Sequence, residues 1–81
     1  MIYTTFHYYL EDKPLRLHRP VEVVPQIDSK VYFPEENLLG LVTYVEHVLA
    51  TDQFLNKPTY HVNVVLKLLD PLMALEHHGL P

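Results

Sequence analysis

The chain has 81 residues, enough for one hydrophobic core and too few for two. It is 48% hydrophobic and 20% charged, with a formal net charge of -4, which excludes both a disordered tail and a basic nucleic-acid module. The lack of cysteine excludes disulfides, thiolate metal sites and thiol catalysis. No apolar run reaches the roughly 18–20 residues of a membrane span, and the N-terminus lacks a signal-peptide layout, so we expect a cytoplasmic protein without a membrane partner.

The first two predicted strands form a hairpin. Residues 2–10 are aromatic and β-branched and alternate between two faces, as a half-buried strand does. A turn at 11–14 precedes residues 15–24, where the alternation resumes. Pro20 cannot donate to a ladder, which indicates an edge strand or a bulge. The outward face of the first strand would carry Tyr3, Thr5, His7 and Tyr9.

Three further strands are predicted, at residues 30–33, 41–49 and 59–69. In the second of these, a central bulge would let Val42 and Val45 both point inward. The third has the clearest alternation, from Tyr60 to Leu68. Between these two strands, residues 51–58 predict a longer loop with one helical turn after Thr51.

The C-terminal residues predict a short helix over 71–78. Asp70 suits the N-cap, Pro71 the first helical position and Gly79 the position just past the end. A helix of this length is not stable alone, so it must pack on another part of the molecule.

These elements predict a single, mainly β domain over residues 1–81: a small antiparallel SH3-like barrel or a curled sheet of about five strands. The order of segments in residues 21–69 carries a resemblance, namely Pro25-Gln26-Ile27-Asp28 before Val31 and Phe33, then Gly40-Leu41-Val42, Val45 and His47, then the strand Tyr60 to Leu68. This layout resembles that of small uncharacterised bacterial and phage SH3-like β-barrel proteins. The resemblance implies a fold and no chemistry.

Histidine is the one enriched functional residue type, at His7, His18, His47, His61, His77 and His78. Imidazole is a common metal ligand, but there is no His-x-x-x-His pair on a helix and no cysteine, so the sequence predicts no metal site and no cofactor. A cross-strand cluster of His7, His18 and His61 stays open as an alternative. If the imidazoles lie at an interface between subunits, assembly should weaken below about pH 6.

The sequence offers little material for catalysis. Ser29 is the only serine, no Gly-x-Ser-x-Gly elbow is present, and two isolated glycines make no phosphate-binding loop. No nucleophile, base and orienting group occur together, so we expect no enzymatic activity and assign no catalytic residue. The six Lys and Arg residues are scattered among ten acids, which argues against nucleic-acid binding.

The hydrophobic content exceeds what one small core needs, so we expect part of it to meet another chain. Outward aromatic and histidine side chains are typical of protein interfaces, although some of these residues could instead be buried within the chain. The predicted interface residues are Tyr3, His7, Tyr9, Tyr32, Phe54, Leu55, His61, Val65, Leu72 and Leu75.

The sequence therefore predicts a non-catalytic binding or accessory protein that acts through a protein–protein interface, as a homo-oligomer or with another protein. Analogy at the level of fold suggests an inhibitor from a phage or mobile element. The alternative is an oligomeric protein that binds or sequesters a small nucleotide-like ligand, with the base stacked on tyrosine and phosphate bound by arginine or lysine. Its predicted ligand-binding residues are Arg16, Arg19, Lys30 and Tyr32.

Overall fold

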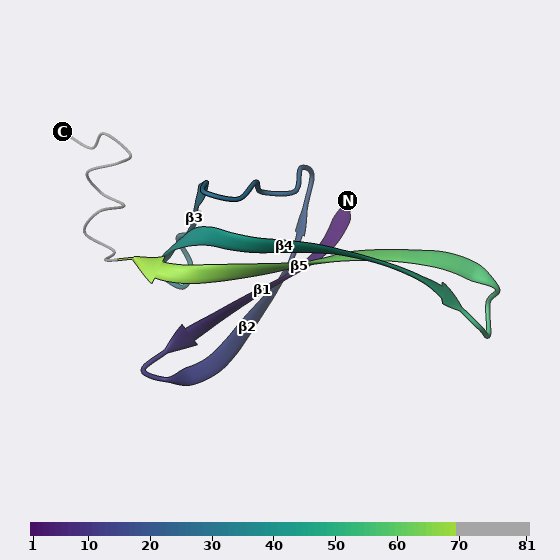
Figure 1. Cartoon of the computed structure of the whole chain (residues 1–81), viewed down its shortest axis with the longest axis horizontal. Helices are drawn as coiled ribbons and strands as arrows, with labels where there is room; N and C mark the ends of the chain where they lie inside the picture. The colour runs from purple at the N-terminus through teal and green to yellow at the C-terminus, as the bar shows by residue number, and fades with distance from the viewer. Residues whose placement is uncertain (70–81) are drawn as a thin grey trace.

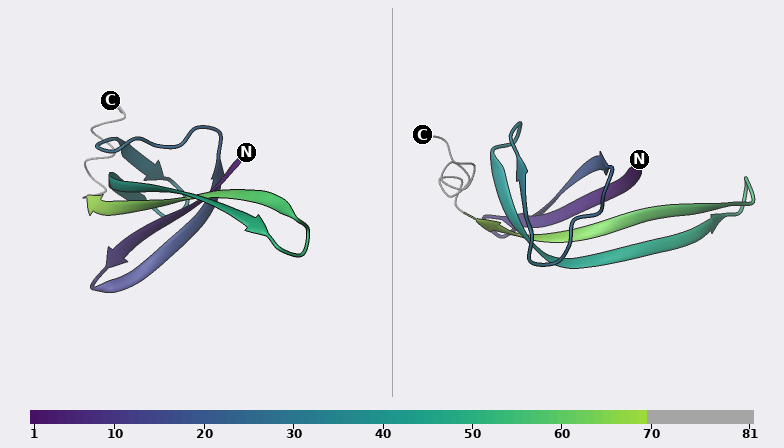
Figure 2. Two further views of the ribbon diagram at one scale, coloured as in Figure 1. Left: turned by 45° about the vertical axis from the view of Figure 1, so that its right-hand side comes forward. Right: turned by 90° about the horizontal axis from the view of Figure 1, so that it is seen from above.

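Five strands form one curled sheet in the computed structural model, which describes residues 1–69 (Figure 1). Their bounds are β1 Ile2–Leu10, β2 Lys13–Val21, β3 Lys30–Phe33, β4 Leu38–Asp52 and β5 Lys57–Leu69. The prediction of a mainly β fold is confirmed, and the sheet curls into half a barrel (Figure 2). The predicted helix at 71–78, with the predicted interface residues Leu72 and Leu75, lies outside the described residues.

The strand order across the sheet is β2-β1-β5-β4-β3. Neighbouring strands are antiparallel except in the centre, where β1 pairs with β5 in parallel, Tyr3–His7 against His61–Val65. The predicted antiparallel arrangement of the barrel or curled sheet is therefore wrong at this pair. Alternation within a strand fixes which face each side chain takes, but it carries no information on the direction of a partner far away in the sequence.

The core lies in the concave side of the curled sheet and joins strands that are far apart in its order. Val42, Val62 and Val64 are fully buried there. Phe6 of β1 and Phe33 of β3 meet edge to face, with ring centroids 4.9 Å apart. These contacts are possible only because the sheet bends, so core packing holds the curl.

An ion pair bridges the open side of the half-barrel. Arg19 on the edge strand β2 donates from Nη2 to both carboxylate oxygens of Glu36, 2.8 Å from Oε2. Glu36 lies in the turn between β3 and β4, at the other edge of the sheet. Two sheet edges that share no backbone hydrogen bonds are thereby linked through side chains.

The predicted bulge in the fourth strand is confirmed. The register between β4 and β5 shifts between Val42 and Tyr44, so Val42 is buried in the core and Val45 packs against it. The preceding loop pairs with β4 at this point, because Asp28 N donates to Val42 O at 2.8 Å and Val42 N donates to Ser29 O at 2.9 Å. The loop thereby pairs with the edge of β4 at Val42, directly before β3 begins at Lys30.

The first hairpin differs from its predicted limits at both ends of β2. Its turn consists of Glu11 and Asp12, with φ values of 51° and 65°, so β2 begins at Lys13 instead of 15. The strand ends at Val21 instead of 24 because Val21 pairs with Ile2, the first residue of β1. No strand residue remains to pair with Glu22 and the residues after it.

The second hairpin is longer than predicted. β4 begins at Leu38 and reaches Asp52, and β5 begins at Lys57, so strand replaces both ends of the loop predicted at 51–58 and a turn at 53–56 remains. β3 pairs only with residues 38–41 of β4, and β1 only with residues 61–65 of β5. The remaining part of the hairpin projects beyond the other strands (Figures 1 and 2). We call residues 49–60 the arm.

Gly40 provides a test of the packing between β4 and β5. A Cβ at this position would lie 2.9 Å from both Cβ and Cδ1 of Leu66, and Leu66 Cβ is fixed to the backbone of β5. We therefore expect Gly40→Ala to lower the free energy of unfolding by about 1–3 kcal/mol through overpacking, measured by urea denaturation.

The double variant Gly40→Ala/Leu66→Ala separates overpacking from other effects of the substitution. Leu66→Ala removes the close contacts with Cδ1 and Cδ2 and keeps the contact with Cβ. The loss from Gly40→Ala should therefore be smaller in the Leu66→Ala background than in the wild type. An equal loss in both backgrounds would contradict a contribution of Leu66 Cδ1 and Cδ2 to the overpacking.

Candidate functional site

One candidate surface is the outer face, which we define as the side of β2, β1, β5 and β4 turned away from the core. Cross-strand partners align Tyr9 with Pro14 in a short rung, and they form three further rungs that span all four strands. Those rungs are Arg16–His7–Val65–Tyr44, His18–Thr5–Asn63–Glu46 and Pro20–Tyr3–His61–Val48. The chain is acidic overall. The three rungs, in contrast, contain three imidazoles, one guanidinium and only one carboxylate.

Side-chain hydrogen bonds link β4, β5 and β1 across this face. Asn63 Nδ2 donates to Glu46 Oε1 at 3.0 Å, which leaves Asn63 Oδ1 to accept from His7 Nε2, also at 3.0 Å. Because Asn63 Oδ1 can only accept, His7 Nε2 carries the proton in this hydrogen bond. The carboxylate of Glu46 is linked to His7 only through the neutral amide of Asn63.

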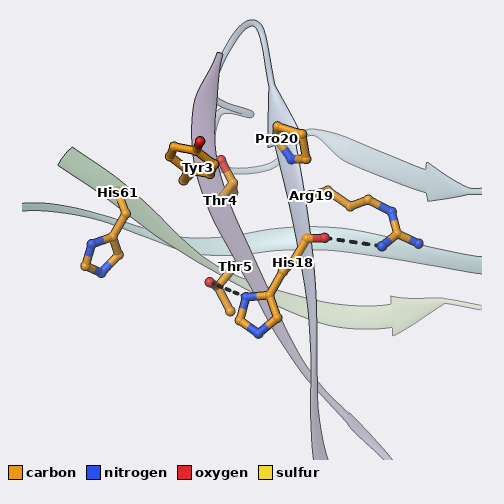
Figure 3. A pocket seen from close by; sticks show the side chains of 7 residues that line it. All are labelled: Tyr3, Thr4, Thr5, His18, Arg19, Pro20 and His61. Carbon is orange, nitrogen blue, oxygen red and sulfur yellow. Dashed lines mark hydrogen bonds between the residues drawn. The ribbon is translucent and has the colours of Figure 1, made fainter. Parts of the chain in front are cut away.

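A hollow of about 300 Å³ lies at one end of the outer face. Figure 3 shows Tyr3 of β1 and His61 of β5 beside it, with the Thr5 hydroxyl bonded to His18 Nδ1 at 3.1 Å. Arg19 also borders the hollow, but its guanidinium extends away from the other side chains (Figure 3). This hollow therefore has aromatic and imidazole walls without a permanent charge directed into it.

A larger hollow of about 530 Å³ lies further along β1 and β2. Its walls combine apolar groups with one imidazole and one guanidinium. The lining residues are His7, Tyr8, Tyr9, Pro14, Leu15, Arg16 and Val65. Since His7 faces Arg16 directly across the two strands, the nitrogen-bearing side chains of this hollow are adjacent.

The second candidate surface is the tip of the arm. Phe54 is 100% exposed and Leu55 is 65% exposed. The turn that carries them is fixed locally, because Asp52 Oδ1 accepts hydrogen bonds from the backbone N–H groups of Phe54 at 2.9 Å and Leu55 at 3.1 Å. Hydrogen bonds within the turn therefore fix the backbone at Phe54 and Leu55, although their side chains are exposed to water.

The inner face of the arm continues the core face of β4 and β5 into solvent. Leu49 lies directly opposite Tyr60 and is 78% exposed. Tyr60 stacks on His47, with ring centroids 5.9 Å apart, and its hydroxyl lies 2.8 Å from His47 Nδ1. At the root of the arm, a hollow of about 320 Å³ borders Ile27 and Val45. Apolar surface therefore extends along the arm.

The structure divides the predicted interface residues between these surfaces. Tyr3, His7, Tyr9, His61 and Val65 share the outer face, and Phe54 and Leu55 share the arm tip. Tyr32 lies on β3, half-buried, with its hydroxyl 3.4 Å from Asn37 Oδ1.

The residues predicted to bind a ligand are not brought together. Arg16 is on the outer face, whereas Arg19 turns to the other face and pairs with Glu36. Lys30 and Tyr32 lie on β3, at the opposite edge of the sheet from β2.

The sequence did not identify Leu49 and Tyr60 as surface residues. Their alternation assigns them to the series that includes Val45 and Val62, and they do lie on that face. They are exposed because β4 and β5 extend beyond the strands and the loop that cover the core. The signal for this exposure is that β4 and β5 are longer than β3 and β1, the strands that flank them in the sheet.

Three histidines form side-chain hydrogen bonds within the described residues. Their partners are Thr5, Asn63 and Tyr60, and none of these is a serine or a carboxylate. Ser29 donates to the backbone carbonyl of Gln26 within its own turn. Within residues 1–69, no three His, Asp or Glu side chains are grouped so that they could hold a metal ion. The cross-strand cluster of His7, His18 and His61 therefore does not form a metal site of this kind.

The part of the chain that the structure describes contains no helix of the length and apolarity needed to cross a bilayer. No protein family, curated protein or solved structure matches the chain.

Proposed function

We propose that the chain is a non-catalytic binding protein that acts through a protein–protein interface, with the arm as its binding element and a second copy of the chain as a partner. The observation that carries the proposal is the exposure of Leu49, Phe54 and Leu55 on a projecting hairpin whose turn is fixed by Asp52. Exposed apolar groups on a defined backbone lose little conformational freedom when a partner covers them.

The edge of β4 supports the same function. From Thr43 to Asp52 this edge has no partner strand within the described residues and contains no proline. The other long edge, on β2, contains Pro14 and Pro20, which protect a sheet against further pairing. A strand from another chain can therefore add to β4 while apolar side chains of the arm are covered, as in β-strand addition.

Self-association is supported by the size of the domain. A single core in a chain this short is marginally stable, and the sequence has no disulfide to reinforce it. Two copies of the same edge strand are antiparallel across a two-fold axis, so β4 can pair with β4 of a second copy.

Light scattering coupled to gel filtration tests this proposal. We expect a mass of at least twice the 9.5 kDa of one chain, falling towards one chain on dilution. A mass of one chain at every concentration up to about 1 mM would contradict self-association, because it would place the dissociation constant above the millimolar range.

A further inference from the structure

We propose that the larger hollow on the outer face binds a nucleoside phosphate, with the base against Tyr9 and Pro14 and the phosphate at Arg16. This site is distinct from the arm and goes beyond the proposed protein interface. Its volume of about 530 Å³ lies in the range of small-molecule sites. Its lining, mainly apolar with a few nitrogen donors, has the composition typical of such sites.

The platform for the base is the rung formed by Tyr9 and Pro14. These residues are direct cross-strand partners, and Tyr9 is 69% exposed. An aromatic ring held on a strand offers a flat face on which any nucleobase can stack, since every base has a π face. Val65 adds apolar surface from β5 on the other side of His7.

The phosphate position is the neighbouring rung, where Arg16 lies directly opposite His7. Within residues 1–69 the Arg16 guanidinium forms no ion pair or hydrogen bond, so its donors are available to a ligand. Guanidinium groups bind phosphate oxygens through paired N–H donors. The carboxylate in the outer-face rungs, Glu46, lies on β4, three strands from Arg16, and already accepts a hydrogen bond from Asn63.

The spacing of the two rungs suits one nucleotide. Tyr9 and His7 are two positions apart along β1, which corresponds to about 7 Å in an extended strand. A ribose separates base and 5′-phosphate by a similar distance. One nucleotide can therefore place its base on Tyr9 and its phosphate beside Arg16 without leaving the hollow.

The smaller hollow of the outer face is the weaker candidate. It also contains a tyrosine, Tyr3, and two imidazoles, His18 and His61. Its nearest arginine, Arg19, points away from it (Figure 3) and is already paired with Glu36. No guanidinium is therefore directed at a phosphate there.

Titration with adenosine 5′-monophosphate (AMP), followed by calorimetry and by NMR of the full chain, tests the site. We expect saturable binding with shifts centred on Tyr9 and Arg16, and AMP should bind at least tenfold more tightly than adenosine or inorganic phosphate. Arg16→Gln should weaken AMP binding at least tenfold. Arg19→Gln is the matched control, because it removes the same side chain from the opposite face of the same strand, and it should change the affinity less than twofold.

Three outcomes would overturn the proposal. These are the absence of saturable AMP binding up to 10 mM, equal losses from Arg16→Gln and Arg19→Gln, or affinity for oligothymidylates that rises steadily with length and exceeds that for AMP. The last result would indicate an extended nucleic-acid surface instead of a site for one nucleotide. Phe54→Ser should leave AMP binding unchanged, so failure of the arm as an interface and failure of this site are distinguishable.

Discussion

Replacing Phe6 with alanine is expected to lower the free energy of unfolding by about 3–5 kcal/mol. Phe6 is 1% exposed and its ring meets Phe33 edge to face, so the substitution removes the contact that joins β1 to β3 across the concave side. A domain of this size has few alternative contacts to compensate, and this loss is a large part of its total stability. Urea denaturation followed by circular dichroism measures the change.

Phe54→Ala is the matched control, since it removes the same ring from a fully exposed position. At a protein concentration where the chain is monomeric, it should change the free energy of unfolding by less than about 0.5 kcal/mol. If Phe6→Ala does not fold, Phe6→Leu offers a smaller change of the same sign. Comparable losses from Phe6→Leu and Phe54→Ala would show that the core is not where the structure places it.

The second large effect is expected from the arm. Leu49→Ser combined with Phe54→Ser should weaken self-association at least tenfold, which corresponds to about 1.4 kcal/mol. Both side chains are exposed in the single chain, so the substitutions remove apolar surface that only a partner can cover. Sedimentation over a range of protein concentrations gives the dissociation constants.

The control for the arm is the pair Tyr3→Ser and Tyr9→Ser on the outer face. These side chains are 71% and 69% exposed, so the double variant removes comparable apolar surface from a different place. It should leave the dissociation constant within about twofold. If it weakens association more than the arm variant does, the interface lies on the outer face and the arm has another role.

The faces of the strands were predictable from the sequence because alternation has a simple physical cause. Phe6 and Tyr8 are buried while Tyr3 and Tyr9 are exposed, as a period of two requires. The bulge was predictable for the same reason, because Val42 and Val45 cannot both face the core in a regular strand.

The pairing of strands and the extent of coverage were not predictable in this way. The parallel contact between β1 and β5 joins residues about as far apart as the described chain allows, and no local pattern encodes its direction. The exposure of Leu49 has a similar origin. Its residue type and spacing are those of a core residue, and only the end of the neighbouring strand leaves it in water.

The rungs of the outer face also depend on register between strands. Arg16 and His7 are adjacent because the turn at Glu11 and Asp12 has two residues, and a different turn length would pair Arg16 with another residue. The sequence showed scattered positive charge. The register places one of these charges, Arg16, on the same face as His7, His18 and His61.

The position of β1 beside β5, the central strand of the sheet, has a consequence for biosynthesis. The ribosome delivers β1 first, yet its parallel neighbour emerges only after almost the whole described chain has been made. Until then, the early hairpin exposes Phe6 and Tyr8 with no sheet to receive them, and closing so long a loop is slow. The nascent chain should therefore depend on chaperone protection until β5 leaves the exit tunnel.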